Sequence, residues 1–148
     1  MSDTIRQSIC AERLAKLLTI SKSAGYSIDY PTIEEWKLTA NPPANLPAIE
    51  LRDESCDVEK YDRDNTAWRL HLTVIISARG DETQEDLRNY VNDVYKCFGT
   101  DIFCGGYGEI IPEGDNMTLQ QEEDVYGDIE IKFSVKFETK SWDLTSRY

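Results

Sequence analysis

Asp128-Ile-Glu-Ile-Lys-Phe-Ser-Val-Lys-Phe-Glu138 is the stretch that decides the fold of this chain. Side chains alternate between the two faces of a strand, so this segment has one apolar and one polar face. The apolar face carries Ile129, Ile131, Phe133, Val135 and Phe137, and the polar face carries Glu130, Lys132, Ser134, Lys136 and Glu138. A strand wetted on one face is typical of an antiparallel sheet, and Gly127 is expected to mark its start.

A second strand of the same kind is predicted over Ala67–Ala78, and it is the natural partner of the first. Its apolar face carries Trp68, Leu70, Leu72, Val74 and Ile76, with Ile75 as an exception on the polar face. A short strand is expected at Ala48–Arg52. Within Tyr26–Leu38 the pattern is weaker and Pro31 removes a backbone donor, which indicates an extended or edge segment.

Two helices complete the expected fold. The first spans Asp3–Ile20 and begins at a cap provided by Ser2, Asp3 or Thr4, with Gly25 as a left-handed stop beyond it. Its apolar stripe consists of Ile5, Ile9, Leu14, Leu17 and Leu18. The second helix follows Gly80, with Asp81 and Gln84 as a capping pair, and ends at Gly99. Its core-facing residues are expected to be Leu87, Val91, Val94 and Phe98.

The sequence therefore predicts an α+β fold, with a mostly antiparallel β-sheet and two main α-helices packed on one face. At 148 residues, the chain is expected to form a single domain over residues 1–148. The acidic stretches at residues 53–65 and 101–125 are expected to be exposed loops. The alternatives are a hairpin tip for residues 53–65 and a short strand at Ile110 and Ile111, before Pro112.

The composition excludes several classes of partner. The formal net charge is −12 and the pI is about 4.5. Binding to nucleic acid through phosphate neutralisation needs clustered basic residues, and so does binding to an anionic membrane surface. The acidic charge of this chain therefore argues against both kinds of partner. No apolar run approaches the roughly 18 residues of a membrane span. No signal-peptide pattern is visible, so the chain is expected in the cytosol.

No motif predicts catalysis, a cofactor or a bound metal, and we expect none of the three. The four cysteines contain no CxxC pair, His71 is the one histidine, and free thiols are expected. Gly105-Gly-Tyr-Gly108 lacks the spacing of a phosphate-binding loop. Asp62-Arg-Asp-Asn65 departs from a calcium loop because Ala67 replaces the glycine at the sixth position.

Taken in order, the expected elements resemble the tail terminator, or tail completion, proteins of long-tailed bacteriophages (minor tail protein U-like). The closing strand ends in the aromatic-X-Thr pattern of that family, here Phe137-Glu-Thr139. Residues 101–124 have no counterpart in the resemblance. The other matching features are Ile5–Ile20, Leu46-Pro-Ala-Ile-Glu-Leu51, Trp68-Arg-Leu-His-Leu-Thr-Val-Ile-Ile76 and Asp86-Leu-Arg-Asn-Tyr-Val-Asn-Asp-Val94.

The resemblance implies a homo-oligomeric ring, commonly a hexamer, that caps the tail tube, ends its growth and joins the head-side connector protein. DNA passes through the hole, and the protein belongs to the virion tail after assembly in the host cytoplasm. Carboxylates in the lumen would repel phosphates in transit. Candidates for the lumen or rim are Asp53, Glu54, Asp57, Glu59, Asp62, Asp64, Glu113, Asp115, Glu122, Glu123 and Asp124. Candidates for the subunit interface are Trp36, Tyr107, Tyr126, Trp142 and Tyr148.

Other interpretations stay open at this point. The chain could be another neck or tail component of similar fold, an acidic interaction module that mimics DNA, or a small enzyme with carboxylates in a cleft. For the acidic stretches the alternative is an ordinary solvated surface, and for each aromatic residue the alternative is ordinary packing.

Overall fold

The sheet is built around the pair formed by β3 (Asn65–Arg79) and β5 (Val125–Lys140). A computed structural model describes residues 3–36, 45–121 and 125–147. The two strands are antiparallel and pair without a bulge, from Asn65 opposite Lys140 to Arg79 opposite Tyr126. The predicted pairing is therefore confirmed. The apolar face of β5 is buried as predicted, at Ile129, Ile131, Phe133, Val135 and Phe137.

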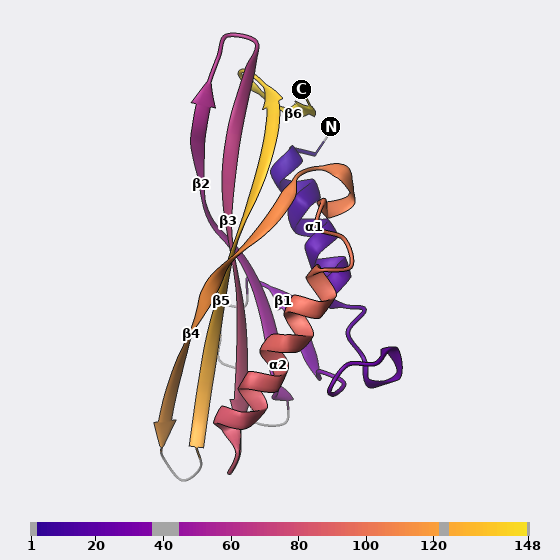
Figure 1. The fold of residues 1–148 in the computed structure, drawn as a ribbon, viewed down its shortest axis with the longest axis vertical. Coiled ribbons are helices and arrows are strands. Elements are labelled where there is room, and N and C mark those ends of the chain that lie inside the picture. Colours follow the sequence, from indigo (N-terminus) through magenta and orange to yellow (C-terminus); the bar gives the residue numbers. More distant parts are fainter. Residues whose placement is uncertain (1–2, 37–44, 122–124, 148) are drawn as a thin grey trace.

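Four further strands extend this pair. They are β1 (Thr32–Glu35), β2 (Ala48–Tyr61), β4 (Glu109–Gln121) and β6 (Asp143–Arg147). The order is β1-β2-β3-β5-β4, with β6 on β5, and β1 is parallel to β2 while the other pairs are antiparallel. The fold is thus α+β with a curled, mostly antiparallel sheet and two helices (Figure 1).

Loops were predicted for the two acidic stretches, and this is wrong for most of their length, whereas the alternatives of a hairpin tip at residues 53–65 and a short strand at Ile110 and Ile111 are confirmed. Residues 53–61 belong to β2, and residues 109–121 form β4. Both strands are largely exposed beyond the covered part of the sheet. Acidic residues fit such strands, because a partner strand binds the backbone while the side chains remain in water. The connection between β2 and β3 shortens to residues 62–64.

The first helix, α1 (Ile5–Leu17), begins at Thr4, whose hydroxyl accepts a hydrogen bond from the Gln7 amide at 3.1 Å. A short 3₁₀ helix, η1 (Lys22–Ala24), follows and ends at Gly25, which is left-handed as predicted. The predicted stripe is wrong at Leu18, which is 60% exposed, and Arg13 is buried although it lies off that stripe. The buried face of α1 therefore points toward residues 98–101, where Arg13 donates hydrogen bonds to the carbonyl groups of Phe98 and Asp101.

The second helix, α2 (Thr83–Phe98), packs against β5 and β3, and buries Leu87, Val94 and Phe98 as predicted. The predicted capping pair is wrong, because the cap is Glu82 and its side chain makes no capping hydrogen bond. The hydroxyl of Thr83 instead donates to the carbonyls of Gly80 and Val125, at 2.6 and 3.1 Å. Gly99 closes the helix, before a second 3₁₀ turn, η3 (Cys104–Gly106).

Gly127 was predicted to mark the start of β5. It instead lies inside this strand, close to Leu119, Thr83 and Leu87. A Cβ there would lie 2.5 Å from Leu119, so close packing explains the glycine better than a strand start does.

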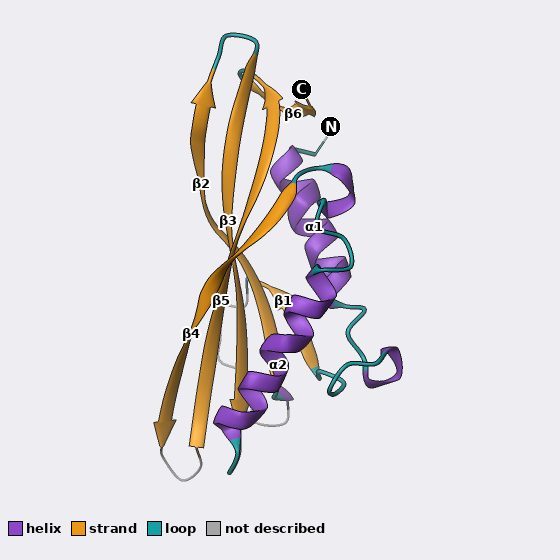
Figure 2. Ribbon diagram, viewed as in Figure 1, coloured by secondary structure: helices purple, strands orange, loops and turns teal. Residues whose placement is uncertain are grey.

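The end of the β2–β3 hairpin extends past the helices, and β6 and the neighbouring end of β5 lie beside it (Figure 2). We call this projection, residues 56–70 with 137–147, the arm.

Candidate functional site

The polar face of the sheet contains a hollow between two β-bulges. The register shifts between Asp53 and Ser55 on β2, and between Pro112 and Gly114 on β4, which leaves Glu54 and Glu113 as the extra residues. Both bulges lie at one level, because Asp53 and Pro112 oppose Leu72 and Phe133, which oppose each other. Bulges redirect side chains and are frequent beside functional sites. Here they place one carboxylate at each side of the hollow.

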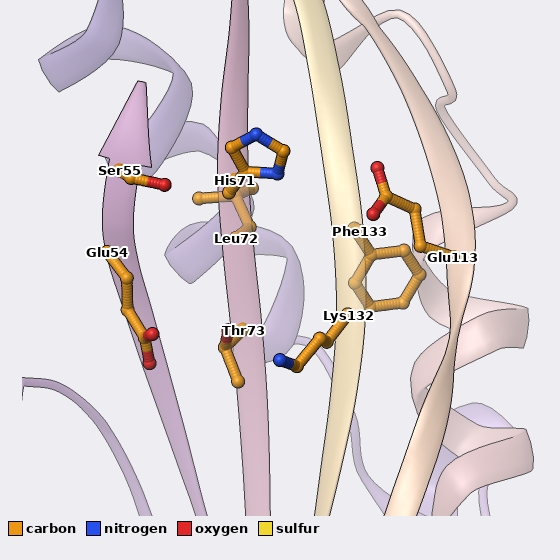
Figure 3. Close-up of a pocket in the computed structure, with 8 residues that line it drawn as sticks. All are labelled: Glu54, Ser55, His71, Leu72, Thr73, Glu113, Lys132 and Phe133. Carbon is orange, nitrogen blue, oxygen red and sulfur yellow. The ribbon is translucent and has the colours of Figure 1, made fainter. Parts of the chain in front are cut away.

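Basic and hydroxyl groups lie between these two glutamates. Figure 3 shows His71, Thr73 and Lys132 on the central strands, with Glu54 and Glu113 on the outer ones. The hollow has a volume of about 290 Å³ and opens to solvent. Among the described residues, Lys132 forms no ion pair and the hydroxyl of Ser134, which is 1% exposed, has no hydrogen-bond partner. The hollow therefore offers mixed charge to a polar partner, whereas the Ser134 hydroxyl is buried and does not line it.

His71 and Asp57 form a histidine–carboxylate pair at the edge of this hollow. Nε2 of His71 lies 2.8 Å from Oδ2 of Asp57. Ser134 lies opposite His71 in the sheet, but its hydroxyl does not reach hydrogen-bonding distance of the ring or of any other described group. A serine nucleophile needs its base within hydrogen-bond reach. Serine, histidine and aspartate, the residue types of a hydrolytic triad, are thus adjacent at Ser134, His71 and Asp57. The hydrogen bond from the serine to the histidine that such a triad needs is not formed.

Asp53 is the lumen candidate that the structure turns inward. Its Oδ2 accepts a hydrogen bond from Nε of Arg6 on α1, and its Oδ1 accepts one from Nε1 of Trp36, both at 2.7 Å. Burial acts to raise the pKa of this carboxyl group, yet the bonds from Trp36 and Arg6 hold the pKa below its ordinary value. Asp53 therefore connects α1, the end of β1 and β2 inside one molecule.

The remaining acidic candidates are distributed along separate parts of the sheet. Asp57 pairs with His71, and Glu59 pairs with Arg69 at 2.5 Å. Asp62 and Asp64 form the turn of the arm, where the Asp62 side chain accepts a bond from the Asp64 amide. Asp115 is exposed on β4 with Glu113. Glu122, Glu123 and Asp124 lie outside the described residues. The candidates on β2 and β4 thus lie on strands that β3 and β5 separate, rather than in one cluster.

The arm carries an exposed apolar patch that the sequence indicated only at Trp142. Trp142 is 89% exposed and has a left-handed backbone, with φ of 64°. Its indole N–H donates to the Tyr61 hydroxyl at 3.1 Å, and the two rings meet edge to face. Large exposed patches on soluble proteins mark interaction surfaces. We call this the arm patch; it surrounds a hollow of about 380 Å³ lined by Val58, Tyr61, Thr66, Trp68, Trp142 and Leu144.

The other aromatic candidates make contacts within the chain. Trp36 bonds to Asp53 and lies under the guanidinium of Arg52. Tyr107 packs against the core under Arg147, whose guanidinium lies 4.1 Å from the ring centre. Tyr126 is half-buried on β5, and Tyr148 lies outside the described residues. The sequence did not single out Val58, Tyr61 or Leu144 as members of an exposed patch. Val58 and Tyr61 lie inside the acidic stretch 53–65, and apolar residues in such a stretch were the signal that could have identified these two.

The four cysteines are free, as predicted, and Cys10 lies in a cluster that could hold a metal only poorly. Donor atoms of Cys10, Glu35 and Asp53 lie within 4.8 Å of one another. Arg6 and Trp36 already occupy both oxygens of Asp53. Burial, with Asp53 and Glu35 nearby, raises the pKa of Cys10 to about 12, so the thiol keeps its proton. A divalent cation would have to displace that proton beside the positive charge of Arg6.

Among residues 3–36, 45–121 and 125–147, no helix has the length and apolar character needed to cross a membrane. In comparisons with known proteins, the sequence matches no family model and no curated protein.

Proposed function

We propose that this chain is a structural protein of a phage or prophage tail, which forms a ring at the end of the tail tube. The ring ends the growth of the tube, joins it to the head-side connector and lets DNA pass. The order of elements supports this proposal, because a helix, an edge strand, two long strands, a helix and the long strand β5 follow one another as in the resemblance described above, although β4 precedes β5 and β6 follows it in this chain.

The observation that carries the proposal is the exposed arm patch. An indole that is 89% exposed on a strained backbone is costly for an isolated subunit, by about 1 kcal/mol for the backbone alone. Burial against another protein removes that exposed apolar surface from water. Aromatic anchors on a projecting arm are therefore expected in a subunit that works inside an assembly.

In this proposal, α1 and α2 cover the same face of the sheet, and the other face lines the hole. The second face carries Glu54, Glu113 and the paired Asp57, along with Lys132. A surface of mixed charge with excess carboxylate repels phosphates and gives passing DNA no groove of basic side chains.

Two other functions remain as alternatives, and the first is another neck or tail component of similar fold. The second is an acidic module that imitates DNA. The pairing of Asp57 with His71 and of Glu59 with Arg69 disfavours the second, because a DNA mimic presents unpaired carboxylates at phosphate-like spacing. Catalysis is not part of the proposal.

The test combines molar mass in solution with recruitment to tail tubes. Six subunits of 17.0 kDa give about 102 kDa, and closed rings follow from contacts between two different patches. We expect a discrete species near that mass, either in solution or on purified tubes. A protein that stays monomeric and that purified tubes do not recruit would contradict the proposal. Replacing Glu54, Asp57 and Glu113 by their amides, without any change in DNA passage or tail joining, would remove the assigned role of the carboxylates.

A further inference from the structure

A second exposed apolar surface, which we call the body patch, lies on the described residues between α2 and β4. Ile102 and Phe103 are 41% and 58% exposed there. They adjoin an apolar hollow of about 180 Å³, which is lined by Tyr95, Phe98, Gly99, Ile102, Ile110, Pro112 and Phe133. Its walls come from packed residues of α2, β4 and β5, so the hollow is part of the rigid body of the subunit.

The two patches are alike in chemistry, because both are mainly apolar. The body patch offers a shallow apolar hollow beside two projecting side chains, Ile102 and Phe103. The arm patch offers one projecting indole, Trp142, beside an apolar hollow of about 380 Å³. Each surface therefore has both a protruding group and a depression, and the protruding group of one suits the depression of the other. Both patches remain exposed in the isolated chain, so neither covers the other within one subunit.

Charge favours the same pairing. The chain carries a net charge of −12, so two copies repel each other unless they meet at a less acidic surface. The arm is close to balanced, with the five basic residues Lys60, Arg63, Arg69, Lys140 and Arg147 and the six acidic residues Asp57, Glu59, Asp62, Asp64, Glu138 and Asp143. Beside the body patch, the acidic residues Asp101 and Asp115 stand against Lys96, so this surface is also only weakly acidic. Burial, together with the Asp115 carboxylate nearby, raises the pKa of Tyr95 at this hollow.

We propose that the arm patch of one copy packs against the body patch of a second copy, with Trp142 seated over the hollow between α2 and β4. This inference rests on the proposed function in one respect, namely that copies of the chain associate. The contact joins two different surfaces, so a pair of subunits keeps one free arm and one free body, and the arrangement propagates head to tail until a ring closes.

The experiment measures molar mass by light scattering across a range of protein concentrations. Trp142→Ala removes the arm anchor, and Ile102→Glu places a charge on the body patch; each variant is expected to lose the oligomer of the parent protein. Leu144→Glu and Phe103→Ser repeat the test with other exposed residues of the same patches. Leu18→Glu is the matched control, because Leu18 is equally exposed on α1 and belongs to neither patch, and it should leave the oligomer unchanged. Circular dichroism verifies that each variant is folded.

Mixing the two defective proteins gives a sharper result. Trp142→Ala retains an intact body patch, and Ile102→Glu retains an intact arm patch. One productive contact can form between them, so the mixture is expected to give a pair of about 34 kDa, twice the 17.0 kDa of the subunit, and no larger ring.

The outcomes separate this inference from the proposed function. A ring that survives both substitutions overturns the arm-to-body contact while the ring itself stands. Loss of assembly in Trp142→Ala but not in Ile102→Glu also overturns it, because an arm-to-arm contact would behave in that way. A parent protein that is monomeric at every concentration overturns it too, whereas recruitment to tubes would still support a tail function. A two-subunit parent that both substitutions dissociate supports the contact and contradicts the ring.

Discussion

At the scale of single residues, Arg13 shows how a charged side chain becomes part of the core. It is fully buried, pairs with Glu12 at 2.5 Å, and lies 5.0 Å from the ring centre of Phe98. It also donates to the carbonyl of Asp101 at 2.7 Å and to that of Phe98 at 3.5 Å. The last carbonyls of a helix have no partner within the helix, and a long basic side chain from α1 supplies one.

We predict that Arg13→Ala lowers the free energy of unfolding by about 3 kcal/mol, because it leaves Glu12 and two carbonyls without their donor. The control is Lys16→Ala, which removes one exposed hydrogen bond to Thr100 and should cost less than about 1 kcal/mol. Urea unfolding followed by circular dichroism measures both. Equal effects of the two substitutions would show that the buried guanidinium does not hold α1 to residues 98–101.

Two buried thiols predict a loss of stability at alkaline pH. Burial raises the pKa of Cys10 and of Cys104 to about 12 from 9.0, so the folded state keeps protons that the unfolded state releases. This stability is fully present below pH 9 and is lost as the pH rises through 9 toward 12. The slope is up to about 1.4 kcal/mol per pH unit for each thiol.

Unfolding curves between pH 8 and about 9.5, below the ordinary pKa of tyrosine of about 10, provide the measurement. The double variant Cys10→Ala/Cys104→Ala should have a flatter dependence on pH than the parent protein, whatever its absolute stability. An unchanged slope would mean that these thiols ionise as easily in the folded state as in the unfolded one.

At the scale of elements, close approach of backbones decides where β4 enters the sheet. Gly108 immediately precedes β4, and a Cβ at this position would lie 2.6 Å from the Lys136 carbonyl oxygen and 2.9 Å from Val135. The neighbouring atoms belong to the backbone and the core of β5, so they cannot move aside cheaply. Glycine is therefore required here by space.

We predict that Gly108→Ala destabilises the protein by about 1–3 kcal/mol, as overpacking does in other cores. Glu109→Ala, at the next and exposed position, should change stability by less than about 0.5 kcal/mol. Urea midpoints at an unchanged slope report the difference. If the two substitutions have equal effects, β4 can shift away from β5 without loss, and the tight contact is not needed.

At the scale of the whole molecule, the net charge opposes the association of copies of the chain and the arm favours it. The net charge of −12 drives copies apart, while the arm patch and the body patch favour association. Salt weakens the first effect, since the screening length falls from about 10 Å at 0.1 M to about 3 Å at 1 M. Kosmotropic salts also strengthen the burial of apolar surface.

We therefore predict that the oligomeric fraction increases when sodium chloride is raised from about 0.05 M to about 0.5 M at a fixed protein concentration. Light scattering or sedimentation velocity measures that fraction. In Trp142→Ala the same change in salt should leave the protein monomeric, because screening removes repulsion but supplies no contact. Dissociation with increasing salt would indicate that ion pairs, rather than apolar patches, hold the subunits together.

The sequence by itself determined the centre of this protein, and only the tertiary structure decided its surfaces. Period-two alternation placed the buried face of Asp128–Glu138 correctly at every apolar position, because a strand with one wet face leaves no other arrangement. The acidic segments failed as loops, since local charge says nothing about whether a distant strand will pair with the backbone. For the same reason the inward turn of Asp53, the burial of Arg13 and the clustering of Trp142 with Tyr61, Val58 and Leu144 were not visible. Each depends on contacts between residues far apart in the chain, which no local pattern encodes.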